Sequence, residues 1–416
     1  MSDSTGTVAS RTRDFIEVAE RYGAHNYHPL EVVVSRGEGV WVWDVDGERY
    51  LDCLAAYSAV NQGHCHPAIV GALREQAEKL TLTSRAFHND KMGGYLRKLC
   101  QLLGYDKALP MNTGAEGVET AIKMARKWGY RVKGVADGQA EIVVCSGNFH
   151  GRTTTIVGFS DDPGARGGFG PFTPGFVKIP YGDLEALEAA IGAHTVGFLV
   201  EPIQGEGGVV MPPEGYLAAA AELCRRHDVL FIADEVQTGL GRTGKLLACQ
   251  WEDVRPDVVI LGKALGGGVY PVSAVLADDE IMQVFTPGDH GSTFGGNPLA
   301  SAVAVAALDV LLDEGLVDNA RELGDWFIER LQAVDSPHVK HVRGRGLMIG
   351  VVIEDSSGPA RPFCKALGRR GVLCKETHEQ TIRFAPPLVI TREILEGVLP
   401  DIEAVLRGEG VDLQPR

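Results

Sequence analysis

Apolar residues along the middle of the chain follow two alternating patterns. Short continuous apolar runs rich in β-branched residues occupy residues 142–145, 196–200, 229–233 and 258–261. Between them, apolar residues recur at helical spacing, at 116–133, 184–191 and 214–227. A buried parallel strand is apolar on both faces, whereas a surface helix is apolar along one side only. The alternation therefore predicts an α/β domain with a mostly parallel sheet between two layers of helices.

The two ends of the chain carry a different mixture of patterns. Near the start, the sequence predicts strands at 31–35 and 40–44, joined by a glycine-rich turn. A helix is expected at 298–314, and beyond it short strands at 347–353 and 381–384 lie among helical stretches. Such a mixture is typical of a small α+β domain beside the larger one.

We therefore expect three parts. Residues 1–55 form an N-terminal segment that packs with the small domain, residues 56–314 the large domain, and residues 315–416 the small C-terminal domain. Ligands of open parallel sheets bind beyond the carboxyl ends of the strands. The strand ends of the large domain are thus the candidate site.

Composition and charge narrow the class of protein. Hydrophobic residues make up 44% and charged residues 23% of the chain, the balance of an ordinary globular protein. The net charge of −15 argues against nucleic acid or an anionic membrane as a partner. No stretch reaches the roughly 18 uncharged apolar residues of a membrane-spanning helix. The polar first ten residues lack the apolar core of a secretory signal, so we expect a soluble cytoplasmic protein.

The cysteines do not suggest a disulfide framework or a metal site. Eight of them are scattered along the chain without a CxxC pair, which predicts reduced thiols. His64, Cys65 and His66 are consecutive. Ligands this close together rarely converge on one ion, so no metal is expected.

Two polar side chains follow predicted strands. Asp234 comes directly after the run at 229–233, and Lys263 follows the run at 258–261 after one glycine. A lysine beside an apolar strand loses hydration, which lowers the pKa of its amine and makes it a plausible Schiff-base nucleophile. Taken singly, each residue has a common structural explanation, as a loop cap or as a surface lysine at a strand end.

A third feature makes the combination specific. Residues 112–116, with the sequence NTGAE, open the helix predicted after them, and small residues there let backbone N–H groups face an anion. Pyridoxal 5'-phosphate (PLP) needs an amine that forms an imine, an acid at its ring nitrogen and a phosphate cradle. Lys263, Asp234 and residues 112–116 supply all three. The sequence therefore predicts PLP as the cofactor.

Two rival nucleotide motifs fail on their context. Residues 239–244 fit the pattern GxGxxG, but Asp234 and Glu235 separate them from their strand, and no long helix is evident after them. The same stretch nearly makes a P-loop, but Leu246 stands where a Ser or Thr must hold Mg²⁺. Dinucleotide and nucleoside-triphosphate binding are therefore disfavoured.

Longer runs resemble the class III aminotransferases. FIADEVQTGLGRTG at 231–244 and LGKALGGG at 261–268 are similar to the signature of that family. Within it, the chain resembles the ornithine aminotransferases over nearly its whole length. The runs that carry this resemblance are GAHNYHP at 23–29, YSAVNQGHCHP at 57–67, EPIQGE at 201–206, GSTFGGNP at 291–298 and RFAPPL at 383–388. The first two distinguish this group from acetylornithine and 4-aminobutyrate aminotransferases.

The resemblance implies a PLP fold of type I, like that of aspartate aminotransferase, and a homodimer with active sites at the subunit interface. Carried over by position, Lys263 holds PLP and acts as the catalytic acid and base. Asp234 pairs with the pyridine nitrogen, and Gln237 lies near the ring hydroxyl.

Further cofactor contacts follow from the same resemblance. Gly114 and Ala115 give backbone N–H groups to the phosphate, and Phe149 stacks on the ring. Thr293 reaches the phosphate from the partner subunit. His150 stands where some relatives have Trp, which leaves the packing over the ring open.

The resemblance also implies the substrate contacts. Arg152 clamps the distal carboxylate of ornithine, because a guanidinium binds a carboxylate through two parallel hydrogen bonds. Tyr27 contacts the α-amino group of ornithine, and Tyr57 lines the same pocket. Arg383 takes the α-carboxylate of glutamate, and Glu206 pairs with Arg383 while ornithine is bound.

The expected reaction converts L-ornithine and 2-oxoglutarate into L-glutamate 5-semialdehyde and L-glutamate, in the context of proline biosynthesis or arginine metabolism. The alternatives are another ω-amine donor (acetylornithine, lysine or 4-aminobutyrate), an aminomutase or epimerase on the same scaffold, and a catalytically silent binding protein. Intact Lys263, Asp234 and Arg152 speak against the last of these.

Overall fold

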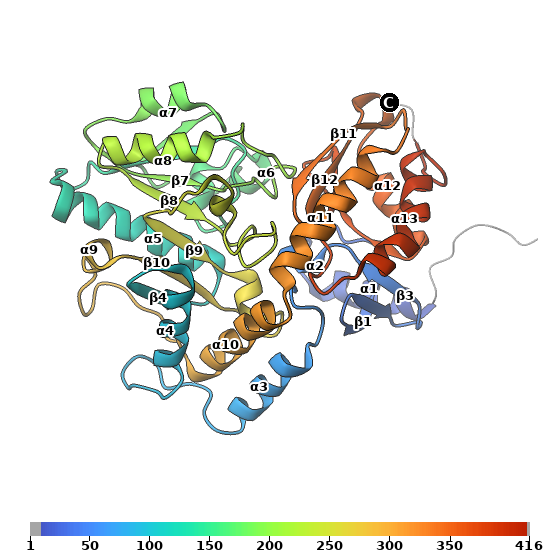
Figure 1. Cartoon of the computed structure of the whole chain (residues 1–416), viewed down its shortest axis with the longest axis horizontal. Helices are drawn as coiled ribbons and strands as arrows, with labels where there is room; N and C mark the ends of the chain where they lie inside the picture. Colours follow the sequence, from blue (N-terminus) through green and yellow to red (C-terminus); the bar gives the residue numbers. More distant parts are fainter. Residues whose placement is uncertain (1–9, 414–416) are drawn as a thin grey trace, which may run out of the picture.

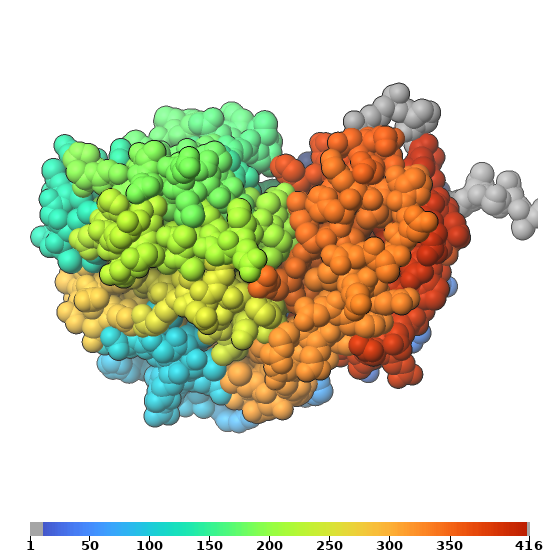
Figure 2. Space-filling view, turned by 45° about the horizontal axis from the view of Figure 1, so that its top comes forward, coloured from blue at the N-terminus to red at the C-terminus, as the bar shows by residue number. Residues whose placement is uncertain are grey.

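The computed structural model describes residues 10–413, which form a large part and a small part (Figure 1). Residues 1–9, where the predicted N-terminal segment begins, and 414–416, where the predicted small domain ends, lie outside the described residues. The large part contains a seven-stranded sheet. Two four-stranded sheets lie outside it, one in the N-terminal segment and one in the small part. In Figure 2 the small part, in orange and red, packs directly against the green and yellow large part.

The large sheet is mostly parallel, as predicted. Its strands run in the order β4 (Lys107–Met111), β10 (Ser273–Ala277), β9 (Val258–Leu261), β8 (Leu230–Asp234), β7 (Thr195–Val200), β5 (Glu141–Cys145) and β6 (Phe176–Ile179). β10 is antiparallel to both of its neighbours, and the four remaining pairings, from β9 to β6, are all parallel. The apolar pattern did not predict β4, β6 or β10. β4 and β6 lie at the sheet edges and contain Pro110 and Lys178, which blunt an edge strand but hide it from a search for apolar runs.

Helices cover both faces of this sheet. The helices of the large part are α2 (Ala55–Ser58), α3 (Pro67–Ala77), α4 (Met92–Leu103), α5 (Gly114–Trp128), α6 (Pro163–Arg166), α7 (Leu184–Ala190), α8 (Tyr216–Arg226), α9 (Asp279–Met282) and α10 (Pro298–Asp313). Phe198 and Phe231 pack toward α7 and α8, whereas Leu199 and Ile232, one residue further along each strand, pack toward α5. Successive side chains on a strand point to opposite faces, which is why these strands are apolar throughout.

The helix predicted at 116–133 is α5, but it differs at both ends. It begins at Gly114, and its last predicted turn is the π-helix Gly129–Lys133. A Cβ atom on Gly129 would lie 2.2 Å from Val196 Cγ1, so the chain approaches β7 there more closely than a side chain permits. The wider turn therefore begins where the helix meets the sheet.

The small part is built around the sheet β11 (Val339–Arg345), β12 (Met348–Ile353), β15 (Thr381–Phe384) and β14 (Lys375–Thr377). Its helices are α11 (Leu316–Gln332), α12 (Arg361–Arg369) and α13 (Arg392–Leu406). The predicted strands at 347–353 and 381–384 are confirmed as β12 and β15.

The N-terminal segment contributes α1 (Ser10–Tyr22) and a sheet of β1 (Val34–Glu38), β2 (Trp41–Asp44) and β3 (Arg49–Asp52). The strand predicted at 31–35 is displaced to β1, because β1 pairs with β2 as far as Glu38 and Trp41 and leaves a tight turn at Gly39. β3 pairs in parallel with β13 (Val372–Leu373) of the small part.

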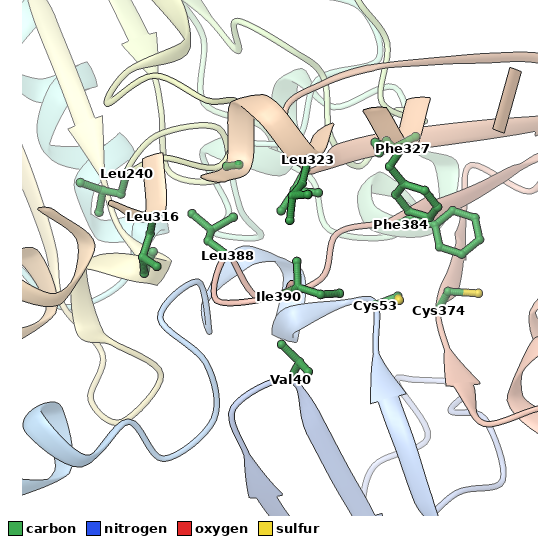
Figure 3. Close-up of a cluster of buried hydrophobic side chains, with 14 of the residues drawn as sticks. Val40, Cys53, Leu240, Leu316, Leu323, Phe327, Cys374, Phe384, Leu388 and Ile390 are labelled. Atoms are coloured by element: carbon green, nitrogen blue, oxygen red, sulfur yellow. The ribbon is translucent and has the colours of Figure 1, made fainter. Parts of the chain in front are cut away.

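One apolar core joins all three regions, as Figure 3 shows. Val40 and Cys53 come from the N-terminal segment, Leu240 from the large sheet's loops, and Phe327 and Phe384 from the small part. The N-terminal segment is thus fixed, through Val40 and Cys53, to a core that also includes Phe384 of β15.

Over residues 10–413, no helix is long and apolar enough to cross a membrane. The same residues contain no group of three or more His, Cys, Asp or Glu side chains that could hold a metal ion.

Candidate active site

A cavity of about 180 Å³ lies at the carboxyl ends of the central strands. Among the residues singled out in the sequence, it is lined by Gly114, Ala115, Phe149, Glu206, Asp234, Gln237 and Lys263. Asp234 is the last residue of β8, and Lys263 follows β9, which is paired in parallel with β8. Adjacent parallel strands end at the same edge of a sheet, which explains why residues so far apart in the sequence meet here.

Lys263 is partly buried, and its surroundings disfavour the charged form of its amine. Burial lowers the pKa of Lys263 from 10.5 to about 8, while the negative charge of Glu206 partly opposes this and Arg383 adds to it. Its φ of +45° is unusual for a residue with a side chain. A partly buried lysine with a lowered pKa, at the start of a 3₁₀ turn, is suited to attack a carbonyl group.

Asp234 is held by two hydrogen bonds. His150 Nδ1 lies 2.6 Å from Asp234 Oδ2, and the backbone N–H of Val236 donates to Oδ1 at 3.1 Å. Burial opposes the charging of His150, but the hydrogen bond and charge of Asp234 outweigh it and raise the pKa of His150. His150 thus fixes the aspartate carboxylate in one orientation toward the cavity.

Glu201 directly follows β7 and also lines the cavity. Its Oε2 accepts the backbone N–H of Phe149 at 2.9 Å, which fixes the position of that aromatic residue. Burial raises the pKa of Glu201 to about 7; His150 opposes the shift and Asp234 adds to it. A carboxyl with this pKa changes its protonation near neutral pH.

The N-terminus of α5 forms an anion cradle. Thr113 and Glu116 make a capping box, in which Thr113 Oγ1 accepts the N–H of Glu116 at 3.2 Å and Glu116 Oε2 accepts the N–H of Thr113 at 2.9 Å. The first N–H groups of a helix have no partner inside it, so those of Gly114 and Ala115 remain available to a ligand. A Cβ on Gly114 would lie 2.9 Å from Val236 Cγ1, so only glycine fits there.

Glu206 and Arg383 form an ion pair beside Lys263. Arg383 Nη1 donates to Glu206 Oε1 at 2.7 Å, and the Arg383 side chain is only 2% exposed. Burial raises the pKa of Glu206, but Arg383 outweighs it, so the pKa is lowered overall. The Arg383 guanidinium lies 5.0 Å from the centre of the Tyr57 ring.

Tyr57 sits in an unusual backbone turn. All four residues of α2, Ala55–Ser58, have positive φ, with Tyr57 at +61°. Asp52 Oδ1 supports the turn by accepting the N–H groups of Leu54 and Ala55 at 2.8 and 2.9 Å. Left-handed backbone at residues with side chains is costly and concentrates at functional sites. Here the turn brings the Tyr57 ring against Arg383.

Comparison with known proteins assigns the family. The model of the aminotransferase class-III family matches residues 22–406. This chain belongs to the class-III aminotransferases. These enzymes are PLP-dependent transaminases of fold type I, so the predicted fold class, enzyme class and cofactor are confirmed.

Several class-III aminotransferases are similar over nearly the whole chain. An ornithine aminotransferase of Exiguobacterium is 60% identical over 397 residues, 95% of this chain and 98% of the relative. One of Halalkalibacterium halodurans is 59% identical over 400 residues, 96% of this chain and all of the relative.

Solved structures of two kinds are also similar. The ornithine aminotransferase of Toxoplasma gondii, crystallised with partial occupancy of PLP at its active site, has a TM-score of 0.94 and 47% identity, covering 95% of this chain and 94% of that one. An acetylornithine aminotransferase of Elizabethkingia anophelis has a TM-score of 0.87 and 54% identity, covering 95% of this chain and 98% of that one.

The cavity of this aminotransferase fits PLP on its own geometry. The amine of Lys263, the carboxylate of Asp234 and the cradle at Gly114 line one space. Gln237 Oε1 is buried without a hydrogen-bond partner within residues 10–413, which leaves it free for a ring hydroxyl. These groups match the three requirements that the sequence suggested.

Five predicted residues are not part of the cavity lining: Tyr57 and Arg383, described above, and Tyr27, Arg152 and Thr293. Tyr27 is 65% exposed, and the Arg152 guanidinium lies 5.8 Å from its ring centre and 5.9 Å from that of Phe149. Thr293 is exposed on the loop before α10 and does not line the cavity of its own chain. Tyr27 and Arg152 gather beside Phe149 at the mouth of the cavity, whereas Thr293 does not.

Sequence reasoning missed the roles of His150 and Glu201. His150 is 84 residues from Asp234, and no local sequence pattern predicts a contact between them. Glu201 had a usable signal, because it ends an apolar strand in the same way as Asp234 does.

Proposed function

We propose that the chain is an ornithine δ-aminotransferase that converts L-ornithine and 2-oxoglutarate into L-glutamate 5-semialdehyde and L-glutamate. The observation that carries the proposal is the ion pair between Glu206 and Arg383, 2.7 Å apart beside Lys263. With the pair closed, the charge of Arg383 is neutralised, and the δ-ammonium group of ornithine can approach. With Glu206 turned away, Arg383 is free to bind the α-carboxylate of a dicarboxylate through parallel hydrogen bonds.

The other end of the substrate is assigned to the mouth of the cavity. Arg152 is the carboxylate clamp, and Tyr27 contacts the α-amino group of ornithine, with Tyr57 lining the path between them and Arg383. The closeness of Arg152 to Tyr27, and of Tyr57 to Arg383, supports this assignment. Full-length relatives at about 60% identity that carry the name ornithine aminotransferase support it as well.

The residues around Lys263 divide the chemistry. PLP, when bound, supplies an aromatic ring that accepts an electron pair. Asp234, oriented by His150, holds a proton at the ring nitrogen. Lys263 Nζ takes a proton from the δ-carbon of ornithine in the first half-reaction and returns one to the α-carbon of glutamate in the second. Gln237 would hold the ring hydroxyl, and Phe149, whose backbone is fixed by Glu201, would hold the face of the ring.

A substrate panel tests the proposal. With 2-oxoglutarate as acceptor, glutamate formation is measured for L-ornithine, N-acetylornithine, L-lysine and 4-aminobutyrate. We expect the highest kcat/KM for L-ornithine. A higher value for any of the other donors would overturn the proposed substrate.

Acetylornithine is the second candidate, since a solved acetylornithine aminotransferase is 54% identical to this chain. The two donors differ at the α-nitrogen, which is a charged ammonium group in ornithine and a neutral amide in acetylornithine. The panel therefore separates them directly.

We further propose a homodimer in which Thr293 contacts the phosphate in the partner's site. Thr293 is exposed, and Phe87 and Phe294 are 72% and 48% exposed, as expected of a surface that a partner covers. Light scattering measures the mass directly, and a monomer at micromolar concentration would contradict this arrangement. The division at residues 55 and 314 and the cytoplasmic location remain predictions.

A further inference from the structure

The segment that carries Tyr27 has no regular secondary structure. Between α1 and β1, local hydrogen bonds join the N–H of Asn26 to Ala24 O at 2.9 Å and the N–H of Val32 to Leu30 O at 2.8 Å. Local bonds of this kind shape a segment but do not fix its distance from the rest of the molecule. The position of Tyr27 must therefore depend on contacts from elsewhere.

Arg361 supplies such a contact from the small part. It is the first residue of α12, and its Nη2 donates to Pro29 O at 3.0 Å. Its Nη1 donates to Glu376 Oε1 on β14 at 2.6 Å. One planar guanidinium thus joins the Tyr27 segment to a strand of the small sheet, with the fixed geometry that lysine cannot match.

The Arg361–Glu376 ion pair is largely shielded from water. The two side chains are only 21% and 15% exposed, and Lys375 Nζ also donates to Glu376 Oε1 at 3.2 Å. Burial raises the pKa of Glu376, but the hydrogen bond from Arg361 outweighs it, so the pKa is lowered overall. Glu376 is therefore ionised at neutral pH, and the pair persists under working conditions.

The next residue of the same strand holds the other end of the substrate site. Thr377 Oγ1 donates to the backbone oxygen of Glu206 at 2.6 Å. The pKa of Tyr57 is raised, mainly by burial and then by the charge of Glu206, with smaller contributions from Tyr27 and Glu376. Tyr57 is thus close to both groups, and β14 holds the Tyr27 segment on one side and Glu206 on the other.

We propose that Arg361 and Glu376 are positioning residues for donor selection, which hold Tyr27 at a fixed distance from the Glu206–Arg383 pair. The inference rests on the proposed function, in which Tyr27 contacts the α-amino group of ornithine. Neither residue touches the substrate. Their effect is to let one ligand reach Tyr27 with its α-amino group and Lys263 with its δ-amine at the same time, since misplacement by about 1 Å is enough to weaken such a site.

The test compares L-ornithine with 5-aminopentanoate, which has the same δ-amine and carboxylate but no α-amino group. In Arg361→Met, the single-turnover kcat/KM for ornithine should fall about tenfold, the loss expected for one hydrogen bond from a charged group. The value for 5-aminopentanoate should change less than about twofold, because no α-amino contact is lost. An equal change for both donors would overturn the proposal.

Arg369→Met is the matched control. Arg369 lies on the same helix, but its Nη2 donates to Gly410 O at 2.5 Å, near the end of the chain. The same substitution there should leave the ratio of the two donors unchanged. Arg361→Lys keeps the charge but not the planar guanidinium. Its ratio of kcat/KM for ornithine to that for 5-aminopentanoate should therefore lie between the ratios of the wild type and Arg361→Met. If Arg361→Met does not fold, Glu376→Gln keeps the shape of its side chain and should shift the ratio in the same direction.

A second measurement separates this inference from the proposed function. Hydrogen exchange of the backbone amides of residues 24–33 should become faster in Arg361→Met than in the wild type and the Arg369→Met control, with no substrate present. Unchanged exchange would show that Arg361 does not anchor residues 24–33. If the wild type does not use ornithine but the exchange does respond, the proposed substrate fails while the anchor stands.

Discussion

The floor and the mouth of the active site are built in different ways. At the floor, Asp234 ends one strand and Lys263 follows the neighbouring parallel strand, and the core below them leaves little freedom. At the mouth, Tyr27 lies on an irregular segment and is 65% exposed. The floor is built from adjacent strand ends and suits chemistry common to the family, whereas the mouth depends on distant contacts and suits the choice of substrate.

The largest expected effect tests the floor. Replacing Lys263 with Ala removes the amine that holds the cofactor and moves the proton, so turnover should fall by at least about 10⁴-fold. The visible absorbance of the bound cofactor should change with it. Circular dichroism checks that the variant is folded. Retention of both turnover and absorbance would show that Lys263 neither holds the cofactor nor moves the proton.

Asp234→Asn tests the acid at the ring nitrogen. The amide keeps the shape of the side chain but loses the charge, so kcat should fall about 10³-fold, within the usual range for acid–base groups. The cofactor should also bind more weakly, as measured by fluorescence titration of the cofactor-free enzyme. A near-normal kcat would show that the contact is structural.

The pH dependence tests how strongly the floor is desolvated. Burial lowers the pKa of Lys263 to about 8, so the rate at which the cofactor-free enzyme captures PLP should rise about tenfold per pH unit below 8 and level off above it. Because the unfolded chain retains this proton up to a higher pH, the group also makes the stability of the cofactor-free enzyme rise between pH 8 and 10.5.

Glu206→Gln sharpens the pH experiment. Glu206 raises the pKa of Lys263, so its neutralisation should move the midpoint of the capture profile to lower pH. A midpoint near 10.5 in the wild type, or a shift to higher pH in the variant, would contradict the electrostatics described for the cavity.

The smallest effect is expected at the mouth. Tyr27→Phe removes one hydroxyl and should lower kcat/KM for ornithine about fivefold to tenfold, the cost of a single hydrogen bond. The half-reaction with glutamate should change less, because glutamate is held by Arg383 as well. An equal loss in both half-reactions would show that Tyr27 serves the general shape of the mouth and not the choice of donor.

Much of the floor could be predicted from the sequence. The apolar runs predicted β5, β7, β8 and β9, and Asp234 and Lys263 are marked by their places after two of these runs. Edge strands β4 and β6 could not be found in the same way, since they carry a proline and a lysine where the pattern requires apolar residues. The strand predicted at 31–35 was wrong by three residues at its start because the register of a hairpin depends on its partner strand.

By itself, the sequence determined that β5, β7, β8 and β9 are buried strands and where the helices between them lie. It also determined which polar residues stand at the ends of these strands, because these features depend on local spacing and on burial of apolar side chains. Only the tertiary structure decided that His150 meets Asp234, that Glu201 fixes Phe149, and that Arg361 joins Pro29 to Glu376. Those contacts join residues from 15 to 332 positions apart, and their geometry depends on how whole elements pack.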